Sequence, residues 1–137
     1  MWTLGIDIAK RKHVAALLDD NGKRVFKNFS FANTMEGVNR LLDRINQVGF
    51  SIENLLIGME ATGHYWMILY HFLSNAGFQV RLINPLMTAA RRNAGIRGTK
   101  TDSVDAELIA NILREADPKF SAVPLPFQMM KSVSCVI

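Results

Sequence analysis

Residues 2–10 have the pattern of a strand that places a carboxylate where a core residue belongs. Leu4 and Ile6 fall on one face by the two-residue strand period, and Asp7 falls on the other. Burial of an isolated ionised carboxylate is so unfavourable that the group must be paired, bound to a metal or protonated. Asp7 therefore needs a partner, and a turn at the strand end or a nearby lysine is the simplest alternative to a metal.

Composition narrows the class of protein. A length of 137 residues with 49% hydrophobic content predicts one globular domain, and a net charge of +4 suits a polyanionic partner such as nucleic acid. The single cysteine, Cys135, excludes an internal disulfide framework, and three scattered histidines leave no zinc-binding spacing. Because no apolar run is long enough for a signal sequence or a membrane span, we expect a cytoplasmic protein with no membrane partner.

The rest of the chain alternates between strand patterns and helix patterns. The first three strands follow one another directly, and an Asn-Gly turn joins the second to the third, which predicts an antiparallel meander. Asn33-Thr34 can cap a first helix that Gly49 ends, and helical spacing predicts further helices between and after the later strands. The strands are expected at residues 2–10, 13–19, 23–31, 54–59 and 78–83, and the helices at residues 34–49, 65–76, 84–92 and 101–117.

Four acids lie at the ends of predicted strands or near the start of the last predicted helix. Asp7 and Glu60 lie at the ends of apolar strands. Asp102 and Asp105 are three residues apart near the start of the last helix and so lie on one face of it. Asp105 shares its helical arc with Ile109 and should point toward the sheet, whereas Asp102 could simply be an acid favoured in a first helical turn.

The order of elements is that of a ribonuclease H-like fold, an α/β fold with a mixed sheet of five strands flanked by helices. The first three strands of that sheet are antiparallel, and the fourth lies parallel beside the central first strand. Ligands of open α/β sheets bind outside the carboxyl ends of strands, so Asp7 and Glu60 should lie side by side beneath the last helix. Four carboxylates repel one another unless cations hold them, which predicts one or two Mg²⁺ or Mn²⁺ ions and phosphodiester chemistry.

Four motifs resemble, in order and spacing, the amino-terminal domain of the DEDD transposases of bacterial insertion sequences, which are related to site-specific DNA invertases and Holliday-junction resolvases. They are Gly5-Ile-Asp-Ile-Ala-Lys10, Met59-Glu-Ala-Thr-Gly-His-Tyr65, Ile83-Asn-Pro85 and Gly98-Thr-Lys-Thr-Asp-Ser-Val-Asp-Ala106. The resemblance implies that the four acids Asp7, Glu60, Asp102 and Asp105 are the catalytic, metal-binding residues.

The resemblance also implies that basic residues lie near DNA or a guide RNA. Residues 93–100 have two glycines and no periodicity, so we expect a mobile basic loop there. The basic residues expected around the acids are Lys10, Arg11, Lys12, Arg91, Arg92, Arg97 and Lys100.

Members of that family continue into a second domain that contributes a catalytic serine, whereas this chain ends at Ile137. We therefore expect a ribonuclease H-like DEDD domain over residues 2–126 and an atypical tail over residues 127–137. Ser132 and Ser134 match no motif and receive no catalytic role. Strand exchange needs several subunits in register, so a full-length member is expected to be a homo-oligomer.

Two other interpretations stay open. The chain could be a non-catalytic remnant that binds nucleic acid, which metal-dependent nicking of branched DNA would distinguish from a transposase domain. It could also be an actin-like or sugar-kinase ATPase domain, since these share the strand-then-acid opening. The stretch Ala9-Lys-Arg-Lys12 argues against the ATPase, because its side chains are bulky and basic where small residues would bind phosphate.

Overall fold

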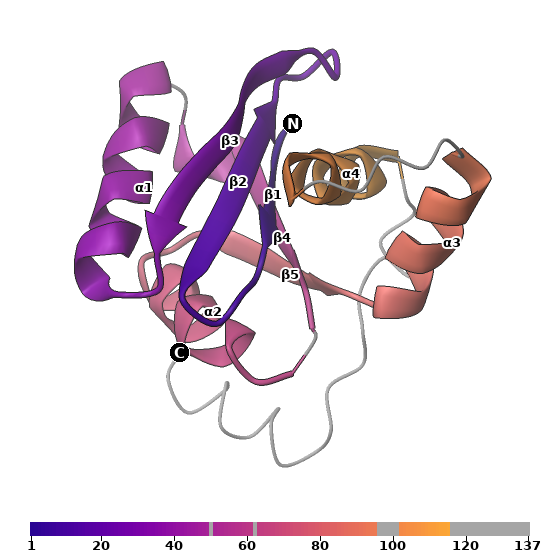
Figure 1. Cartoon of the computed structure of the whole chain (residues 1–137). Helices are drawn as coiled ribbons and strands as arrows, with labels where there is room; N and C mark the ends of the chain where they lie inside the picture. Colours follow the sequence, from indigo (N-terminus) through magenta and orange to yellow (C-terminus); the bar gives the residue numbers. More distant parts are fainter. Residues whose placement is uncertain (50, 62, 96–101, 116–137) are drawn as a thin grey trace.

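The sheet has five strands in the order β3-β2-β1-β4-β5, with helices on both faces (Figure 1). The computed structural model describes residues 1–49, 51–61, 63–95 and 102–115, and for residues 92–95 and 102–105 it describes the backbone alone. The elements are β1 (Trp2–Asp7), β2 (Lys12–Leu18), β3 (Arg24–Ala32), α1 (Met35–Val48), a 3₁₀ turn (Ile52–Asn54), β4 (Leu55–Glu60), α2 (Trp66–Asn75), β5 (Gln79–Ile83), α3 (Pro85–Gly95) and α4 (Asp102–Glu115).

The pairing of the strands confirms the predicted ribonuclease H-like sheet. Strand β1 is central, because it pairs antiparallel with β2 on one side and parallel with β4 on the other. Strand β3 extends the antiparallel part, and β5 extends the parallel part. Two strands of the parallel part, β1 and β4, therefore end at the same edge of the sheet.

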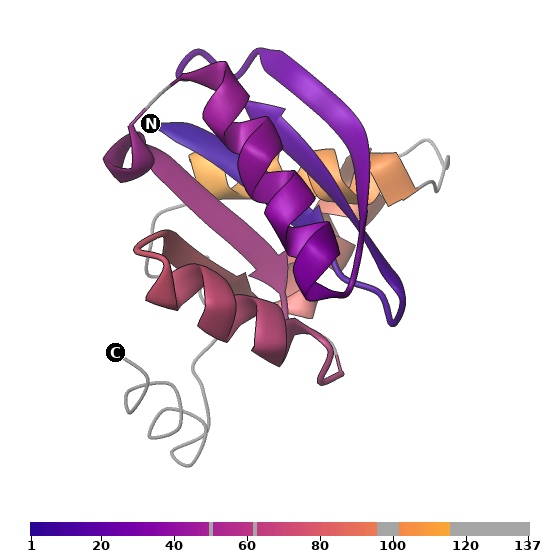
Figure 2. The ribbon, with the colours of Figure 1, turned by 90° about the vertical axis from the view of Figure 1, so that its left-hand side faces the viewer.

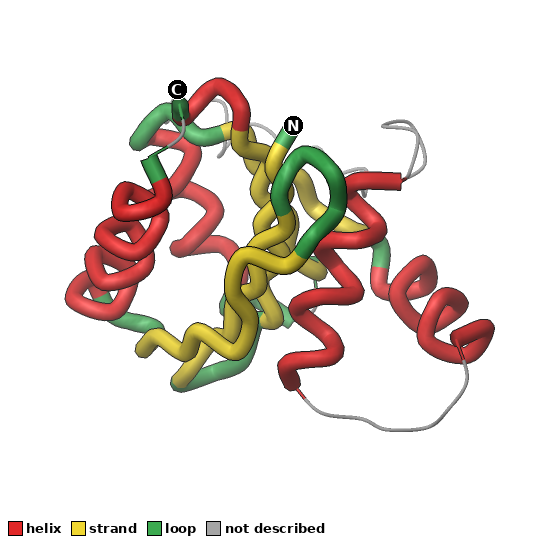
Figure 3. Tube along the Cα trace, turned by 90° about the horizontal axis from the view of Figure 1, so that it is seen from above, coloured by secondary structure: helices red, strands yellow, loops and turns green. Residues whose placement is uncertain are grey.

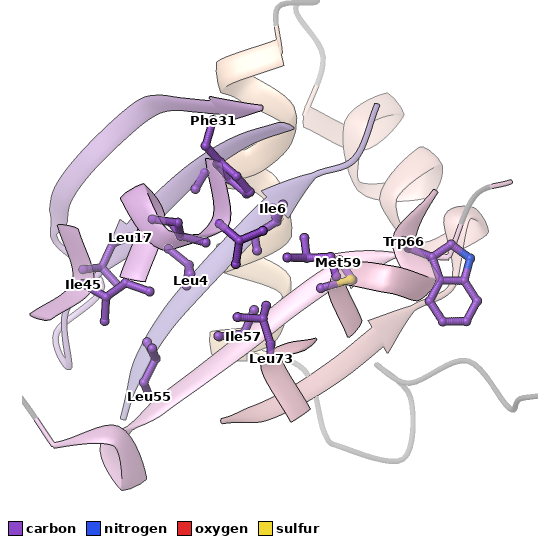
Figure 4. Packing of buried hydrophobic residues seen from close by; sticks show 14 of the residues in the cluster. Leu4, Ile6, Leu17, Phe31, Ile45, Leu55, Ile57, Met59, Trp66 and Leu73 are labelled. Atoms are coloured by element: carbon purple, nitrogen blue, oxygen red, sulfur yellow. The ribbon is translucent and has the colours of Figure 1, made fainter. Parts of the chain in front are cut away.

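One face of the sheet packs against α1 and α2, which lie in front of it in Figure 2. Leu4 and Ile6 of β1 and Ile57 and Met59 of β4 contribute to this core, together with Leu73 of α2 (Figure 4). All five side chains are buried, and burial of a large apolar side chain stabilises the fold by roughly 1.5–3 kcal/mol. The described residues of this face therefore form the main apolar core.

The other face packs against α4, with α3 beyond it (Figure 3). Glycines allow α4 to approach closely: a Cβ on Gly5 would overlap the carbonyl oxygen of Ala106 and lie 2.5 Å from the nitrogen of Ala110. A Cβ on Gly58 would lie 2.5 Å from Cδ1 of Leu113. The backbone of α4 therefore lies directly against β1, and one of its side chains lies against β4.

Local signals located the first helix correctly. The Thr34 hydroxyl accepts a hydrogen bond from the Gly37 amide at 3.1 Å, and Gly49 follows the helix with a positive φ of 85°. These are an ordinary N-cap and an ordinary left-handed C-terminal glycine. The capping residues predicted from the sequence are thus confirmed.

The β2–β3 connection differs from the expected Asn-Gly hairpin. The side chain of Asp19 accepts hydrogen bonds from the amides of Asn21 and Lys23, each at 2.9 Å, and so organises a longer loop. Gly22 has a positive φ of 82°, whereas Asn28 within β3 is the one non-glycine residue with positive φ in the described part of the chain. The register between β2 and β3 shifts near Asn28, as at a β-bulge.

Helix α3 is longer than predicted, since it continues to Gly95 and includes residues 93–95 of the expected loop. Asn84 starts the helix by accepting the Leu86 amide on its side chain at 2.9 Å, and Pro85 suits the first helical position. The prediction of a loop is therefore wrong for residues 93–95. Residues 96–100 of that prediction lie outside the described residues. No helix within the described ranges is long and apolar enough to cross a membrane.

Candidate active site

Asp7 and Glu60 occupy matching positions at the carboxyl ends of two adjacent parallel strands. The last aligned pair of β1 and β4 is Ile6 with Met59, so the residues that follow each of them stand at the same level. Ile6 and Met59 point into the core beneath α1 and α2, and strand alternation therefore directs Asp7 and Glu60 to the opposite face. Both acids are partly exposed, so solvent and ions can reach them.

Glu60 is held by a residue that sequence patterns did not single out. The hydroxyl of Thr88, one turn into α3, donates a hydrogen bond to Oε2 of Glu60. The same hydroxyl lies 2.8 Å from the carbonyl oxygen of Pro85, and the Thr88 side chain is buried. The only sequence signal was its place in a helix that starts directly after β5, the strand beside Glu60.

Helix α4 crosses β1 close to Asp7. Ala106 packs on Gly5, which lies two residues before Asp7, and Asp105 directly precedes Ala106 along the helix. The side chains of Asp102 and Asp105 are outside the described part of the chain, so their convergence with the other two acids stays a prediction. Among the side chains that are described, no three His, Cys, Asp or Glu residues are grouped to hold a metal ion.

The loop between β1 and β2 follows Asp7 and is fixed by hydrogen bonds to its backbone. The Ala9 amide donates to Nδ1 of His13 at 3.1 Å. The side-chain amide of Asn33 donates to the Lys10 carbonyl at 3.2 Å, and its backbone amide donates to the Arg11 carbonyl at 2.9 Å. The exposed side chains of Lys10, Arg11 and Lys12 therefore project from an ordered backbone beside Asp7.

His13 is buried against Phe31, with ring centroids 5.3 Å apart. Burial lowers the pKa of His13, because a charged ring would lose its hydration, and the nearby side chain of Asn33 opposes this shift. Since Nδ1 accepts the Ala9 amide, the neutral ring must hold its proton on Nε2, which has no partner among the described residues. Along β2, His13 shares the face of Ala15 and Leu17, so it supports the loop rather than joining Asp7 and Glu60.

A second contact missed by sequence patterns connects α4 to the start of β3. Nε of Arg24 lies 2.6 Å from Oε2 of Glu107, and a second guanidinium nitrogen lies 3.0 Å from Oε1. The hydrogen bond from Arg24 lowers the pKa of Glu107 and outweighs the opposing effect of partial burial. Glu107 therefore forms a forked contact with Arg24 that orients α4 on the sheet.

The predicted basic residues on α3 are only partly described. Arg91 lies 2.9 Å from Oε1 of Glu115, so it joins α3 to the end of α4. Both side chains are substantially exposed, and such surface pairs contribute about 0–1 kcal/mol. Arg91 can therefore exchange this partner for a phosphate at little cost. The side chain of Arg92, and Arg97 and Lys100 altogether, lie outside the described residues.

The chain is similar to known transposases and DNA-inverting proteins. Residues 4–133 match the DEDD family of IS110, described as transposase. The chain is 34% identical over 116 residues to the pilin gene-inverting proteins of Moraxella lacunata and of Moraxella bovis, covering 84% of this chain and 35% of each of theirs. It is 30% identical over 131 residues to the mini-circle putative transposase for IS117 of Streptomyces coelicolor, covering 95% of this chain and 31% of that protein.

The chain thus spans about a third of the length of the curated relatives that it matches. Among solved structures, it is similar to the structure of Thermus thermophilus RuvC. That similarity has 17% sequence identity and a TM-score of 0.46, and it covers 98% of this chain and 90% of the other.

Proposed function

The chain belongs to the DEDD transposase family, and from this membership we propose that its sheet edge cuts or joins phosphodiester bonds in the DNA of a mobile element with the help of divalent metal. The observation that supports this proposal is the adjacent placement of Asp7 and Glu60 at the ends of β1 and β4. Family membership also favours this function over that of an actin-like or sugar-kinase ATPase. The working domain in this proposal is residues 2–126, followed by the tail at residues 127–137.

The described residues fit a hard divalent cation. Asp7 and Glu60 offer carboxylate oxygens, which Mg²⁺ and Mn²⁺ prefer, and both are exposed enough for the ion to keep bound waters. Asp102 and Asp105 at the start of α4 would complete the set of ligands for one or two ions. When bound, the metal would activate the attacking oxygen and stabilise the leaving oxygen of the phosphodiester.

The loop between β1 and β2, directly after Asp7, would contact the substrate backbone. Lys10 and Arg11 project from this loop, which His13 and Asn33 hold, and Lys12 begins β2, so their positive charges stay close to the acids. Arg91, Arg92, Arg97 and Lys100 would extend the contacts along α3 and beyond it. DNA is the proposed partner, a guide RNA would suit the same charges, and a homo-oligomer would bring two DNA ends together.

The test is nicking of end-labelled branched DNA by the 137-residue chain, with and without Mn²⁺. Parent protein should cleave only with metal, and Asp7→Asn and Glu60→Gln should abolish cleavage while leaving DNA binding intact. Asp43→Asn is the matched control, since Asp43 is an exposed acid on α1. Cleavage by Asp7→Asn at the parental rate would contradict the proposal, and salt-sensitive binding without any cleavage by the parent would favour the non-catalytic remnant.

A further inference from the structure

The start of α3 is attached rigidly to the strand beside Glu60. Glu60 pairs with Ile83 at the end of β5, and the chain turns into α3 directly afterwards. Asn84 holds that turn at two points, because its side chain accepts the Leu86 amide at 2.9 Å and its carbonyl accepts the Met87 amide at 2.8 Å. The first turn of α3 therefore keeps a set position relative to Glu60.

Thr88 places its hydroxyl between two acceptors in this region. It lies 2.8 Å from the Pro85 carbonyl, three residues earlier in the helix, and it also donates to Oε2 of Glu60. A hydroxyl has one proton, and an ionised carboxylate is a stronger acceptor than a neutral carbonyl. Because the side chain is only 1% exposed, water does not compete effectively for this proton.

We propose that Thr88 is a positioning residue that fixes the plane of the Glu60 carboxylate for metal binding. This inference rests on the proposed function, because it assigns a partner to one of the proposed metal ligands. A carboxylate on a flexible side chain can rotate, whereas one held at Oε2 presents its other oxygen in one direction. Partners of this kind are usually worth about 10–100-fold in metal affinity or activity.

Loss of the Thr88 hydroxyl should therefore weaken metal binding without unfolding the protein. The dissociation constant comes from a titration of the 137-residue chain with Mn²⁺ alone. Electron paramagnetic resonance measures the free ion at each step of the titration. Thr88→Val keeps the shape of the side chain but removes the hydroxyl, and it should weaken Mn²⁺ binding by about tenfold or more. Thr88→Ser keeps the hydroxyl and should retain near-parental affinity.

Thr3 provides the matched control for this experiment. It is 2% exposed, as buried as Thr88, and its hydroxyl has no hydrogen-bond partner in the described part of the chain. Thr3→Val should therefore leave Mn²⁺ binding unchanged. Urea unfolding without metal should show that Thr88→Val, Thr88→Ser and Thr3→Val all fold. If Thr88→Val does not fold, Thr88→Ala takes its place.

The outcomes distinguish this inference from the proposed function. Tight binding by the parent and equally tight binding by Thr88→Val, or by Thr88→Ala in its place, would overturn the role of Thr88 while leaving the metal site intact. Weak binding by both Thr88→Val and Thr88→Ser would also overturn it, because the hydroxyl would then not be the decisive group. Absence of specific Mn²⁺ binding by the parent would overturn the metal site and the inference together.

Discussion

Gly5 and Ala106 lie so close together that a methyl group on Gly5 would overlap the Ala106 carbonyl oxygen. This contact brings the helix that starts at Asp102 against the strand that ends at Asp7. A residue with no side chain thus decides how near the two groups of predicted acids can come.

Gly5→Ala should therefore push α4 away from the sheet. The added methyl meets backbone atoms that cannot rotate aside, and overpacking of this kind typically costs about 1–3 kcal/mol. Urea unfolding would measure the loss. Gly58→Ala is the control, because its methyl meets the flexible end of Leu113 and should cost less. An equal or smaller cost for Gly5→Ala would show that α4 is not held by its backbone contact.

Divalent metal should stabilise the parent protein, because it relieves repulsion between carboxylates and binds only the folded site. At a metal concentration about 100 times the dissociation constant, the stabilisation is about 2.7 kcal/mol. The melting temperature of the parent should rise with added Mg²⁺ or Mn²⁺, and that of Asp7→Asn should hardly change. Asp7→Asn should also melt above the metal-free parent. If the two proteins respond alike while Asp43→Asn behaves as the parent does, Asp7 is not a ligand.

His13 should make the protein less stable in mild acid. Burial lowers its pKa in the folded state below the ordinary value of 6.5, so the unfolded chain binds more protons once the pH falls below that value. The contribution of neutral His13 to the free energy of unfolding is therefore fully present above pH 6.5. It is lost as the pH falls toward the lower pKa of His13 in the folded state. Each unit of difference between the two pKa values corresponds to about 1.4 kcal/mol.

Urea unfolding at several pH values between about 7.5 and about 5 would measure the effect of His13. His13→Gln should flatten the dependence on pH. His71→Gln, on α2, is the matched substitution and should leave the slope of the parent in place. A parental slope in His13→Gln would assign the acid sensitivity to other groups.

The basic loop after Asp7 should contribute directly to the salt dependence of DNA binding. Each neutralised phosphate adds about −0.9 to the slope of log affinity against log salt concentration, so Lys10→Gln combined with Lys12→Gln should make the slope shallower by about 1.8. Fluorescence anisotropy with duplex DNA at several salt concentrations would measure it. The control is Lys23→Gln combined with Lys27→Gln. This double substitution removes the same amount of charge from exposed positions on β3 and the turn before it. A matching change in that control would indicate a general charge effect instead of a contact at the loop.

The sequence by itself determined the elements and the two strand-end acids. Apolar runs placed Asp7 and Glu60 near the carboxyl ends of their strands, although the first strand was expected to continue to residue 10 and β1 ends at Asp7. The caps Thr34 and Gly49 bounded the first helix. These signals depend only on neighbouring residues. The order of elements was also enough to predict that β1 is central and β4 lies beside it. It was not enough for the end of α3, where two glycines and the lack of a repeat predicted a loop although the helix continues to Gly95.

Only the tertiary structure decided which side chains from distant segments contact one another. Arg24 and Glu107 are 83 positions apart, and Glu60 and Thr88 are 28 apart, so no local pattern connects them. The role of Gly5 likewise emerged only when α4 was seen to pack on it. The physical reason is that periodicity and capping report the conformation of a segment, whereas a hydrogen bond or a close approach depends on how two finished segments are placed against each other.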